Sequence, residues 1–521
     1  MTVLSENLDD SQREVTAFLS TPGNIEASVD DMKVIETHIS RIFLYKDRAL
    51  KMKRAVRFPY LDFSTLEKRC AACEAEIKTN IRTAPSIYRG VVPVSRNADG
   101  ELELAGDGIP VEWLVDMNRF DEDGLFDRMV SSGQLRRHAM VDLADHVARF
   151  HDQSDRRMDA GGSVGTRLII DSINASFEES VPVLDGQKIE TWTRLSAGVF
   201  DEVAETLDAR RDAGAVRHCH GDMHLRNICM IDGKPVLFDG IEFNADFSEI
   251  DTLYDLAFLI MDLDYRDQRR LANIVLNRYF DVTGEVANRP GTLAVLPLFL
   301  SMRAAVRAHV DAAQSLLLSD PITRNKRRGE AGRYLDFAID YLQPPPPRLV
   351  AVGGLSGSGK SRMAREMAHF IGAAPGARVV RTDAVRKRIA GVQQEARLGA
   401  NGYTHDMHAR TYSAFYEEAK KALAQGASVV ADAVFPGVDQ RFVVEALASA
   451  ENVPFQGLWI EAPEDVRVER VKARQRNISD ITEEIAREQS SYDLGEVTWT
   501  RIDSSGPKDV TVALGRQAIN E

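Results

Sequence analysis

The sequence lacks the features that mark secreted or membrane-spanning proteins. It has only four cysteines in 521 residues, too few for a disulfide framework in a chain this long. No apolar run approaches the roughly 20 residues that span a bilayer, and the longest candidate, residues 293–300, contains Pro297. The first residues are polar and acidic, so no secretory signal is expected. These absences predict a cytoplasmic protein with reduced thiols and no membrane partner.

An excess of positive charge is also missing. Lys and Arg total 65 against 79 Asp and Glu, which gives a net charge of −14. Proteins that bind long nucleic acids neutralise phosphates with Lys and Arg, so the acidic balance disfavours a nucleic-acid partner. A zinc site is disfavoured because Cys219 and Cys229 lack the tight spacing of zinc-binding pairs. What is present is 44% hydrophobic and 28% charged residues, the composition of a globular protein with several domain-sized units.

The run Pro344–Pro347 divides the chain into two parts of different pattern. Four successive prolines cannot be helical and form a short stiff linker. We therefore expect an N-terminal arm over residues 1–30, a first domain over residues 31–343 and a second domain over residues 348–521.

The two domains differ in the order of their predicted elements. The first begins with strands over 39–45 and 49–56, a helix over 64–81 and extended segments over 88–94 and 112–117, and is then mainly helical. The second alternates helices with strands over 348–352, 377–380, 428–431 and 455–460. The fold class is thus α+β joined to α/β: a small sheet lobe with a helical lobe, then a parallel sheet with helices on both faces.

A polar motif interrupts the helical lobe at residues 220–227, with the sequence His-Gly-Asp-Met-His-Leu-Arg-Asn. Phosphoryl transfer needs positioned metals, an in-line nucleophile and neutralised charge on the transferred group. Asp222 can accept the proton of an acceptor hydroxyl, and Asn227 can coordinate magnesium through its amide oxygen. Asp239, after an apolar run, supplies an anionic metal ligand. The motif predicts a catalytic base with two metal ligands.

This motif resembles the catalytic loop of the aminoglycoside phosphotransferase and choline-kinase group of protein-kinase-like folds. The segments 238–244 and 251–257 strengthen the likeness. The resemblance implies a bilobal fold and an ATP-binding ion pair between a strand lysine and a helix carboxylate.

The ion pair has two candidates on each side. Lys51 and Lys53 lie on one face of a predicted strand, and Glu74 and Glu76 lie on the next predicted helix. Lys51 with Glu76 is the favoured pair, and all four possibilities stay open.

A second motif follows the first predicted strand of the second domain. It reads Gly354-Leu355-Ser356-Gly357-Ser358-Gly359-Lys360-Ser361, which is a Walker A phosphate-binding loop. Its glycines let backbone N–H groups surround phosphates at a helix N-terminus. Lys360 reaches the β- and γ-phosphates, and the Ser361 hydroxyl binds magnesium. ATP and Mg²⁺ are the expected cofactors of both domains.

Residues after the loop discriminate between a kinase and an ATPase. Asp383 and Arg386 follow the second strand and resemble the Asp-x-x-Arg element of P-loop kinases such as polynucleotide kinase, zeta toxin and chloramphenicol phosphotransferase. That resemblance implies that Asp383 is the general base and that Arg386 holds substrate or phosphate. Asp432 ends a strand that resembles Walker B and would orient magnesium. Arg474 is the favoured phosphate ligand in an arginine-rich segment that resembles a lid.

The whole arrangement resembles a bacterial family that fuses an aminoglycoside-phosphotransferase-like domain to a P-loop ATPase or kinase domain, from about His38 to Asp503. The chain departs from that family at Asn477, where an acid is expected. The resemblance implies an ATP- and Mg-dependent phosphotransferase with two nucleotide sites that acts on small-molecule hydroxyls. Two alternatives remain: the P-loop domain is a regulatory ATPase or nucleotide sensor, or it is a nucleic-acid end kinase. The sequence indicates neither acceptor nor oligomeric state.

Overall fold

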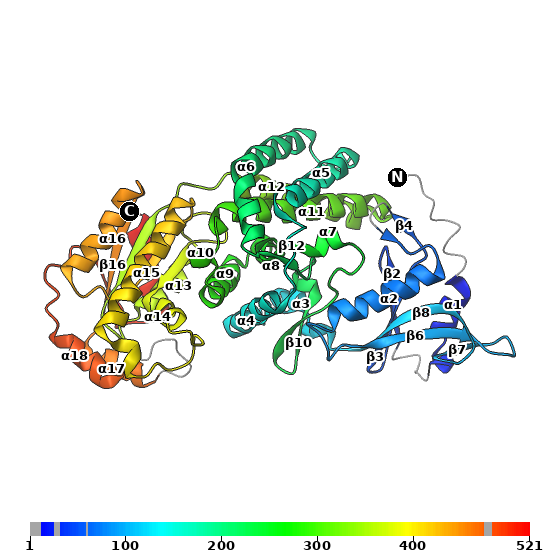
Figure 1. Cartoon of the computed structure of the whole chain (residues 1–521), viewed down its shortest axis with the longest axis horizontal. Helices are drawn as coiled ribbons and strands as arrows, with labels where there is room; N and C mark the ends of the chain where they lie inside the picture. The colour runs from blue at the N-terminus through cyan, green and yellow to red at the C-terminus, as the bar shows by residue number, and fades with distance from the viewer. Residues whose placement is uncertain (1–11, 26–31, 59–60, 474–481, 521) are drawn as a thin grey trace. The chain divides into compact units, whose positions relative to one another are not determined.

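The computed structural model describes residues 12–25, 32–58, 61–473 and 482–520 (Figure 1). The chain forms two compact units. The first contains residues 1–161 and 216–255, and the second contains residues 162–215 and 256–521. The chain therefore leaves the first unit at residue 161, returns at residue 216 and leaves again at residue 255.

The first unit is built on a six-stranded antiparallel sheet in the order β1-β2-β3-β8-β6-β7. Its strands are β1 (Lys33–Glu36), β2 (Ser40–Tyr45), β3 (Arg48–Lys53), β6 (Tyr88–Arg96), β7 (Leu102–Leu104) and β8 (Ile109–Asn118). Helix α2 (Leu66–Asn80) begins where the Thr65 side chain accepts a hydrogen bond from the Lys68 backbone N–H. It packs against β6 and β8, so its inward face lies over the sheet.

The N-terminal segment predicted as an arm contributes to this sheet's core. Helix α1 (Arg13–Leu19) places Val15 and Leu19 in one buried cluster with Phe43 and Leu50. These apolar side chains are spaced by four residues, so they share one helix face and lie away from water. The described part of the segment is therefore integrated in the lobe.

The rest of the first unit carries the first motif. Helices α3 (Phe126–Ser131) and α4 (Arg137–Gln153) precede the departure, and the short strands β4 (Arg57–Phe58) and β5 (Leu61–Asp62) pair with each other. After the return come β9 (Val216–His218), β10 (Ile228–Ile231), β11 (Lys234–Leu237), α7 (Ala245–Ser248) and β12 (Glu249–Asp251). The motif fills the loop between β9 and the β10–β11 hairpin.

The second unit contains a helical part and a parallel sheet. The helices of the first part are α5 (Gly162–Ser180), α6 (Gly186–Asp212), α8 (Thr252–Tyr265), α9 (Arg269–Thr283), α10 (Glu285–Asn288), α11 (Thr292–Leu317) and α12 (Pro321–Tyr341), where α8 begins four residues before the unit boundary. Among the described residues, α11 is the one helix long and apolar enough to cross a membrane, and 67% of that window is buried within the protein. Such burial is typical of a core helix, and Pro297 is accommodated near its start.

The sheet of the second unit is parallel, with five strands in the order β14-β15-β13-β16-β17. Its strands are β13 (Leu349–Gly353), β14 (Arg378–Arg381), β15 (Val429–Asp432), β16 (Phe455–Glu461) and β17 (Thr500–Asp503). The helices are α13 (Lys360–Ala368), α14 (Thr382–Ile389), α15 (His405–Ala424), α16 (Val438–Ala450), α17 (Glu464–Lys472), α18 (Glu483–Glu488) and α19 (Lys508–Asn520). The predicted fold class is confirmed. Strand β17, a short strand with one buried residue, was not among the predicted strands.

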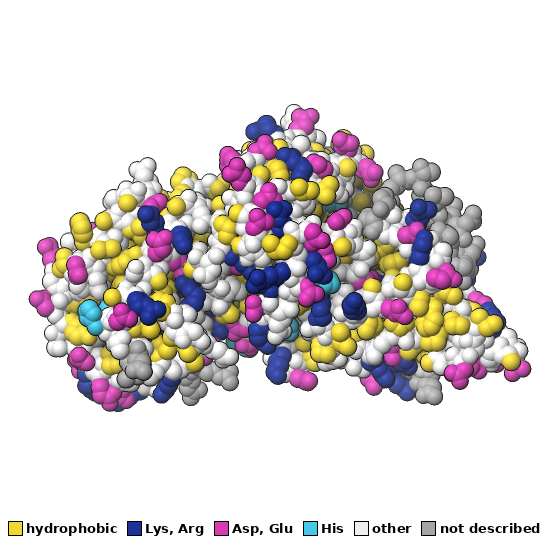
Figure 2. Space-filling view, in the orientation of Figure 1, with side chains coloured by type: hydrophobic (Ala, Val, Ile, Leu, Met, Phe, Trp, Pro, Cys, Tyr) yellow, Lys and Arg dark blue, Asp and Glu magenta, His cyan; other side chains and the backbone are white. Residues whose placement is uncertain are grey.

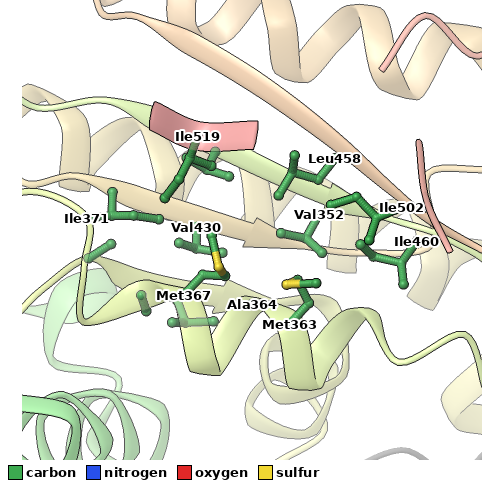
Figure 3. Packing of buried hydrophobic residues seen from close by; sticks show 14 residues of the cluster. Val352, Met363, Ala364, Met367, Ile371, Val430, Leu458, Ile460, Ile502 and Ile519 are labelled. Atoms are coloured by element: carbon green, nitrogen blue, oxygen red, sulfur yellow. The ribbon is translucent and has the colours of Figure 1, made fainter. Parts of the chain in front are cut away.

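Helix α13 packs on this sheet through a row of small and flexible side chains. Met363, Ala364 and Met367 face Val352 and Val430 of the sheet (Figure 3). Spacings of three and four residues place these side chains on one stripe of the helix. This packing fixes the helix whose first turn carries Lys360 and Ser361.

The compact units do not divide the chain at Pro344–Pro347. Residues 256–343 share the second unit with residues 348–521. The prolines mark a change of sequence pattern, but helices α9 and α10 before them pack against helices α13, α14 and α15 that follow.

Candidate active sites

The backbone of the first motif is held by a buried carboxylate. Asp255 accepts hydrogen bonds from the backbone N–H groups of His220 (3.0 Å) and Gly221 (2.8 Å), and His151 Nε2 lies 3.1 Å from it. Gly221 has φ +83°, and a Cβ there would lie 2.7 Å from the Phe247 carbonyl oxygen, so only glycine fits. The sequence showed Asp255 only as part of a family segment, and its role in shaping the loop emerges from the structure.

The structure brings Asp222 and Asn227 into direct contact. The Asn227 amide nitrogen donates to Asp222 Oδ2 (2.9 Å) and to the Asp222 carbonyl oxygen (3.0 Å). The Asp222 side chain is 35% exposed, with His224 Nε2 3.4 Å from its carboxylate. A partly exposed carboxylate can take the proton of an acceptor hydroxyl. The amide beside it can bind a cation close to that hydroxyl.

The His220 side chain is uncharged and holds this loop in place through hydrogen bonds. Burial lowers the pKa of His220 below its ordinary value. Its Nε2 lies 3.0 Å from the Phe238 carbonyl oxygen, and its Nδ1 accepts from the Asp222 backbone N–H at 3.3 Å. These bonds suit a ring with its proton on Nε2.

Lys51 joins the strand lobe to the end of the β10–β11 hairpin. Its Nζ lies 2.9 Å from Glu76 Oε1 and 2.5 Å from Asp239 Oδ1. Burial acts to lower the pKa of Lys51, but the charges of Asp239 and Glu76 raise it well above its ordinary value. Of the two candidate carboxylates on α2, Glu76 is buried inside this network and Glu74 is exposed.

Lys53 forms a second pair beside the first. Its Nζ lies 2.5 Å from Glu76 Oε2 and also contacts the Glu242 carboxylate. Burial raises the pKa of Glu242, partly offset by the Lys53 charge. Both candidate lysines therefore meet Glu76, and Lys51 is the one that also reaches Asp239. Glu242 was not singled out in the sequence, although it lies three residues after Asp239.

Asp239 occupies a left-handed backbone conformation with φ +60°, an uncommon one for a residue with a side chain. Its N–H donates to the Tyr88 hydroxyl (3.1 Å), which helps to hold that conformation. The side chain is 43% exposed; desolvation opposes ionisation, but the Lys51 ammonium lowers the pKa of Asp239 overall. Asn227 lies at the same end of the hairpin, since its carbonyl oxygen accepts from the Phe238 N–H at 3.0 Å. An anionic oxygen and an amide oxygen suit magnesium.

The Walker A loop adopts the conformation that its glycines permit. Gly354, Gly357 and Gly359 have φ of +141°, +86° and +98°. A Cβ on Gly354 would lie 2.4 Å from the Ile460 carbonyl oxygen, so the loop cannot carry a side chain there. Gly359 ends the loop, and α13 begins at Lys360.

The loop borders a cleft of about 560 Å³. The cleft is lined by all the predicted site residues after Leu355 that belong to the described part of the chain. These residues are Ser356, Gly357, Ser358, Gly359, Lys360, Ser361, Asp383, Arg386 and Asp432. Gly354 and Leu355 lie outside the lining, at the strand end of the loop.

Ser361 and Asp432 form the pair expected around a magnesium ion. The Ser361 hydroxyl donates to Asp432 Oδ1 at 3.1 Å. Asp432 ends β15 beside β13, where its Cα pairs with Val352. Burial raises the pKa of Asp432 above its ordinary value, although the Lys360 charge acts against this. Both side chains offer oxygen ligands, which magnesium prefers.

Asp383 lines the same cleft as Lys360, and its role as the general base stays a prediction. Its side chain is 30% exposed and lies 3.5 Å from Arg386 Nη1. The Arg386 guanidinium lies 4.9 Å from the centre of the Tyr403 ring. Arg386 Nε is buried with no hydrogen-bond partner among the described residues.

The arginine-rich segment is only partly a cleft wall. Arg470 lines the cleft and donates to the Ser504 carbonyl oxygen at 2.6 Å. Arg467 is buried and donates to the Ser356 carbonyl oxygen at 3.2 Å, so it supports the phosphate loop from behind. Gln489, which the sequence reading missed, accepts from the Ser356 N–H at 2.7 Å. Arg474 and Asn477 lie outside the described residues.

Comparisons with known domains match both halves of the chain. Residues 79–290 match the phosphotransferase enzyme family, and residues 349–493 match the AAA domain family. Uncharacterized protein Rv2004c of Mycobacterium tuberculosis (strain ATCC 25618 / H37Rv) is 30% identical over 488 residues, 92% of this chain and 93% of that protein. Uncharacterized protein Mb2027c of Mycobacterium bovis matches equally.

Two solved structures also match part of the chain. A choline/ethanolamine kinase family protein from Mesorhizobium loti covers 64% of this chain and 99% of its own, with 11% identity and a TM-score of 0.36. A gluconokinase from Sinorhizobium meliloti 1021 covers 34% of this chain and 95% of its own, with 23% identity and a TM-score of 0.25.

Proposed function

Because the chain belongs to a family of two-module proteins that join a kinase-like phosphotransferase domain to a C-terminal P-loop domain, we propose that it is an ATP-dependent phosphotransferase with two nucleotide sites. Each site transfers the γ-phosphoryl group to a hydroxyl of a small molecule. The observation that carries the proposal is the opening of Asp383 onto the cleft of Lys360, since a base facing the phosphate loop serves transfer to an acceptor.

In the kinase-like site, Lys51 binds phosphate oxygens while Glu76 orients it. Asp239 and Asn227 would hold magnesium, which neutralises phosphate charge when bound. Asp222 accepts the proton of the acceptor hydroxyl as the new O–P bond forms. The bond between the γ-phosphorus and the β–γ bridging oxygen of ATP breaks, and ADP leaves with that oxygen. The partial exposure of Asp222 supports this role, because an acceptor must reach it.

In the P-loop site, Lys360 and the loop N–H groups hold the β- and γ-phosphates. Ser361 and Asp432 would hold magnesium. Asp383 accepts the acceptor's proton, and Arg386 binds the acceptor or the transferred group. Arg470 lines this cleft and adds positive charge beside the phosphate loop, while the role of Arg474 as a phosphate ligand stays a prediction.

The alternative is a regulatory ATPase in the C-terminal half. Hydrolysis needs only a positioned water and the phosphate loop, so it gives no reason for a carboxylate on the acceptor side. A nucleic-acid end kinase is less well supported, because the net charge is −14 and basic and acidic side chains are interspersed on the face shown in Figure 2. The burial of α11 supports a soluble protein, and the cytoplasmic location remains a prediction.

The test is a screen of metabolites for ATP-dependent gain of one phosphate, followed by substitution of the bases. Asp222→Asn should leave Mg-ATP binding nearly intact and lower transfer at the kinase-like site by about 10²–10⁴-fold, the usual contribution of a positioned base. The exposed Asp123→Asn is the matched control and should transfer at the wild-type rate. The proposal fails for this site if Asp222→Asn transfers as fast as the wild type.

A further inference from the structure

Helix α9 covers the open edge of the P-loop sheet within the second unit. Strand β14 is the edge strand, and an edge leaves backbone groups unpaired unless another element covers them. The Asn277 Oδ1 accepts from the Val379 N–H at 2.7 Å, and the amide nitrogens of Asn273 and Asn277 each donate to the Ala377 carbonyl oxygen at 3.1 Å. The side-chain amides of α9 thus provide hydrogen-bond partners for backbone groups at the edge of the sheet.

The same helix face ends in a buried carboxylate. Asn273, Asn277 and Asp281 are spaced by four residues, so they share one face of α9. Asp281 Oδ1 lies 2.7 Å from Arg378 Nη2, and its Oδ2 lies 2.7 Å from Arg381 Nη2. The Asp281 side chain is 3% exposed. Desolvation opposes its charge, but Arg378 and then Arg381 lower the pKa of Asp281 overall.

Arg381 connects this carboxylate to the cleft. It is the last residue of β14, where its Cα pairs with that of Asp432, and it lines the cleft with Lys360 and Asp383. Its side chain is 11% exposed. Arg381 therefore contacts α9 through its guanidinium and is also one of the residues that line the cleft.

We propose that Asp281 is a positioning residue of the C-terminal phosphoryl-transfer site, which holds the Arg381 guanidinium against the negative charge of the phosphoryl group in transfer. The inference rests on the proposed function of this cleft. An arginine stabilises a transferred phosphoryl group only when its planar donors point correctly. The long Arg381 side chain keeps one orientation because Asp281 binds it, and Asp281 is itself fixed by Arg378.

The test uses the full chain and two probes of the same site: Mg-ATP, and Mg-ADP with aluminium fluoride as a mimic of the phosphoryl group in transfer. The binding step that Lys360→Ala removes identifies the site. Asp281→Asn and Arg381→Gln should each weaken the aluminium fluoride complex by about 10-fold or more, and change Mg-ATP affinity by less than about 3-fold. The double variant should bind the complex no more weakly than Arg381→Gln alone, because Asp281 acts through Arg381.

A purely structural role makes different predictions. The losses of aluminium fluoride affinity in the two single variants would then multiply in the double variant, or the affinity for Mg-ATP would fall as much as the affinity for the aluminium fluoride complex. Either result overturns the inference. Unchanged aluminium fluoride binding in Asp281→Asn overturns it as well, as does a wild type that binds Mg-ATP at this site but gains nothing from aluminium fluoride. Glu395→Gln is the control, since its bridge to Arg278 of α9 lies outside the cleft lining.

A second variant covers the case in which Asp281→Asn does not fold. Asp281→Glu keeps the charge but displaces the guanidinium by one methylene, so it should weaken the aluminium fluoride complex and spare Mg-ATP. Failure of the proposed function gives a separate result: a wild type that binds no nucleotide sensitive to Lys360→Ala shows that the cleft is not an ATP site.

Discussion

Lys51 and Lys53 are two residues apart on one strand, so both side chains lie on the same face of the sheet. They share Glu76, and each has a second acidic partner, Asp239 for Lys51 and Glu242 for Lys53. Removing one partner of a buried ion network leaves a charge without compensation and costs more than a surface pair would. Single substitutions here therefore test both stability and nucleotide binding.

The Lys51 pair predicts a pH-dependent stability difference. The pKa of Lys51 is raised and that of Asp239 is lowered. In the wild type both groups therefore stay charged between pH 5 and 8, and their contribution to stability is constant over that range. In Lys51→Met, Asp239 loses its cation and its pKa rises, so the variant loses stability as pH increases. The Tm should fall by on the order of 5 °C at pH 8 and by less at pH 5, measured by thermal unfolding.

The control for this prediction is Lys68→Met on helix α2, whose partner Asp62 is at the surface. It should lower Tm by little at either pH. A Lys51→Met deficit that is the same at both pH values, or larger at pH 5, contradicts the predicted linkage.

Asp383 separates a C-terminal kinase from an ATPase switch. Asp383→Asn should keep the ATP affinity of the P-loop site and abolish transfer to the acceptor, because we propose Asp383 as the base for the acceptor and not as a nucleotide ligand. Slow hydrolysis that depends on Lys360 should persist, since water can still enter. Calorimetry and phosphate release measure the two effects; unchanged transfer would return the C-terminal half to the regulatory ATPase interpretation.

At the scale of elements, α13 shows how packing positions chemistry. The helix presents Met363 and Met367 to the sheet, while its first turn carries Lys360 and Ser361. Phe370 follows Met367 by three residues, a spacing that would place both on one face of a longer helix, but it lies beyond the end of α13 and is 46% exposed. The helix ends at Ala368, so the helical period no longer applies at residue 370.

This difference predicts unequal costs for two substitutions in the same segment. Met367→Ala should destabilise the protein by about 2–5 kcal/mol, because Met367 is fully buried in the core of the P-loop sheet. Phe370→Ala should cost less than about 1 kcal/mol. Urea unfolding of both variants measures the free energies, and similar losses for the two would show that α13 is packed differently.

At the scale of the whole molecule, each compact unit carries its own set of candidate site residues. Lys51, Glu76, Asp222, Asn227 and Asp239 all belong to the first unit, and the Walker A loop with Asp383 and Asp432 belongs to the second. Neither set borrows a residue from the other unit. The two proposed phosphoryl-transfer sites therefore draw their residues from different units.

This composition predicts two nucleotide sites per chain. Isothermal titration of the intact protein with Mg-ATP should give a stoichiometry of two. Lys360→Ala should remove one site, because the Walker A lysine binds the β- and γ-phosphates, and Lys51→Met should remove the other. A stoichiometry of one that Lys360→Ala leaves unchanged contradicts the proposal for the second unit.

The sequence by itself determined which phosphotransferase and P-loop motifs the chain carries, because such motifs are local. The Walker A loop, the segment 220–227 and the strand–helix alternation after residue 348 predicted the fold class of both halves, which the structure and the comparisons confirm. Turn glycines, a run of apolar residues and a helix N-terminus are short-range signals, readable from neighbouring residues alone.

Tertiary structure decided which distant residues meet. The choice of Glu76 over Glu74, the support of the first motif by Asp255 and the contact of Asp281 with Arg381 each join positions at least 25 residues apart. The two compact units likewise divide the chain away from its prolines. Such pairings depend on how helices and sheets pack, since burial and charge compensation act between elements that no local pattern connects.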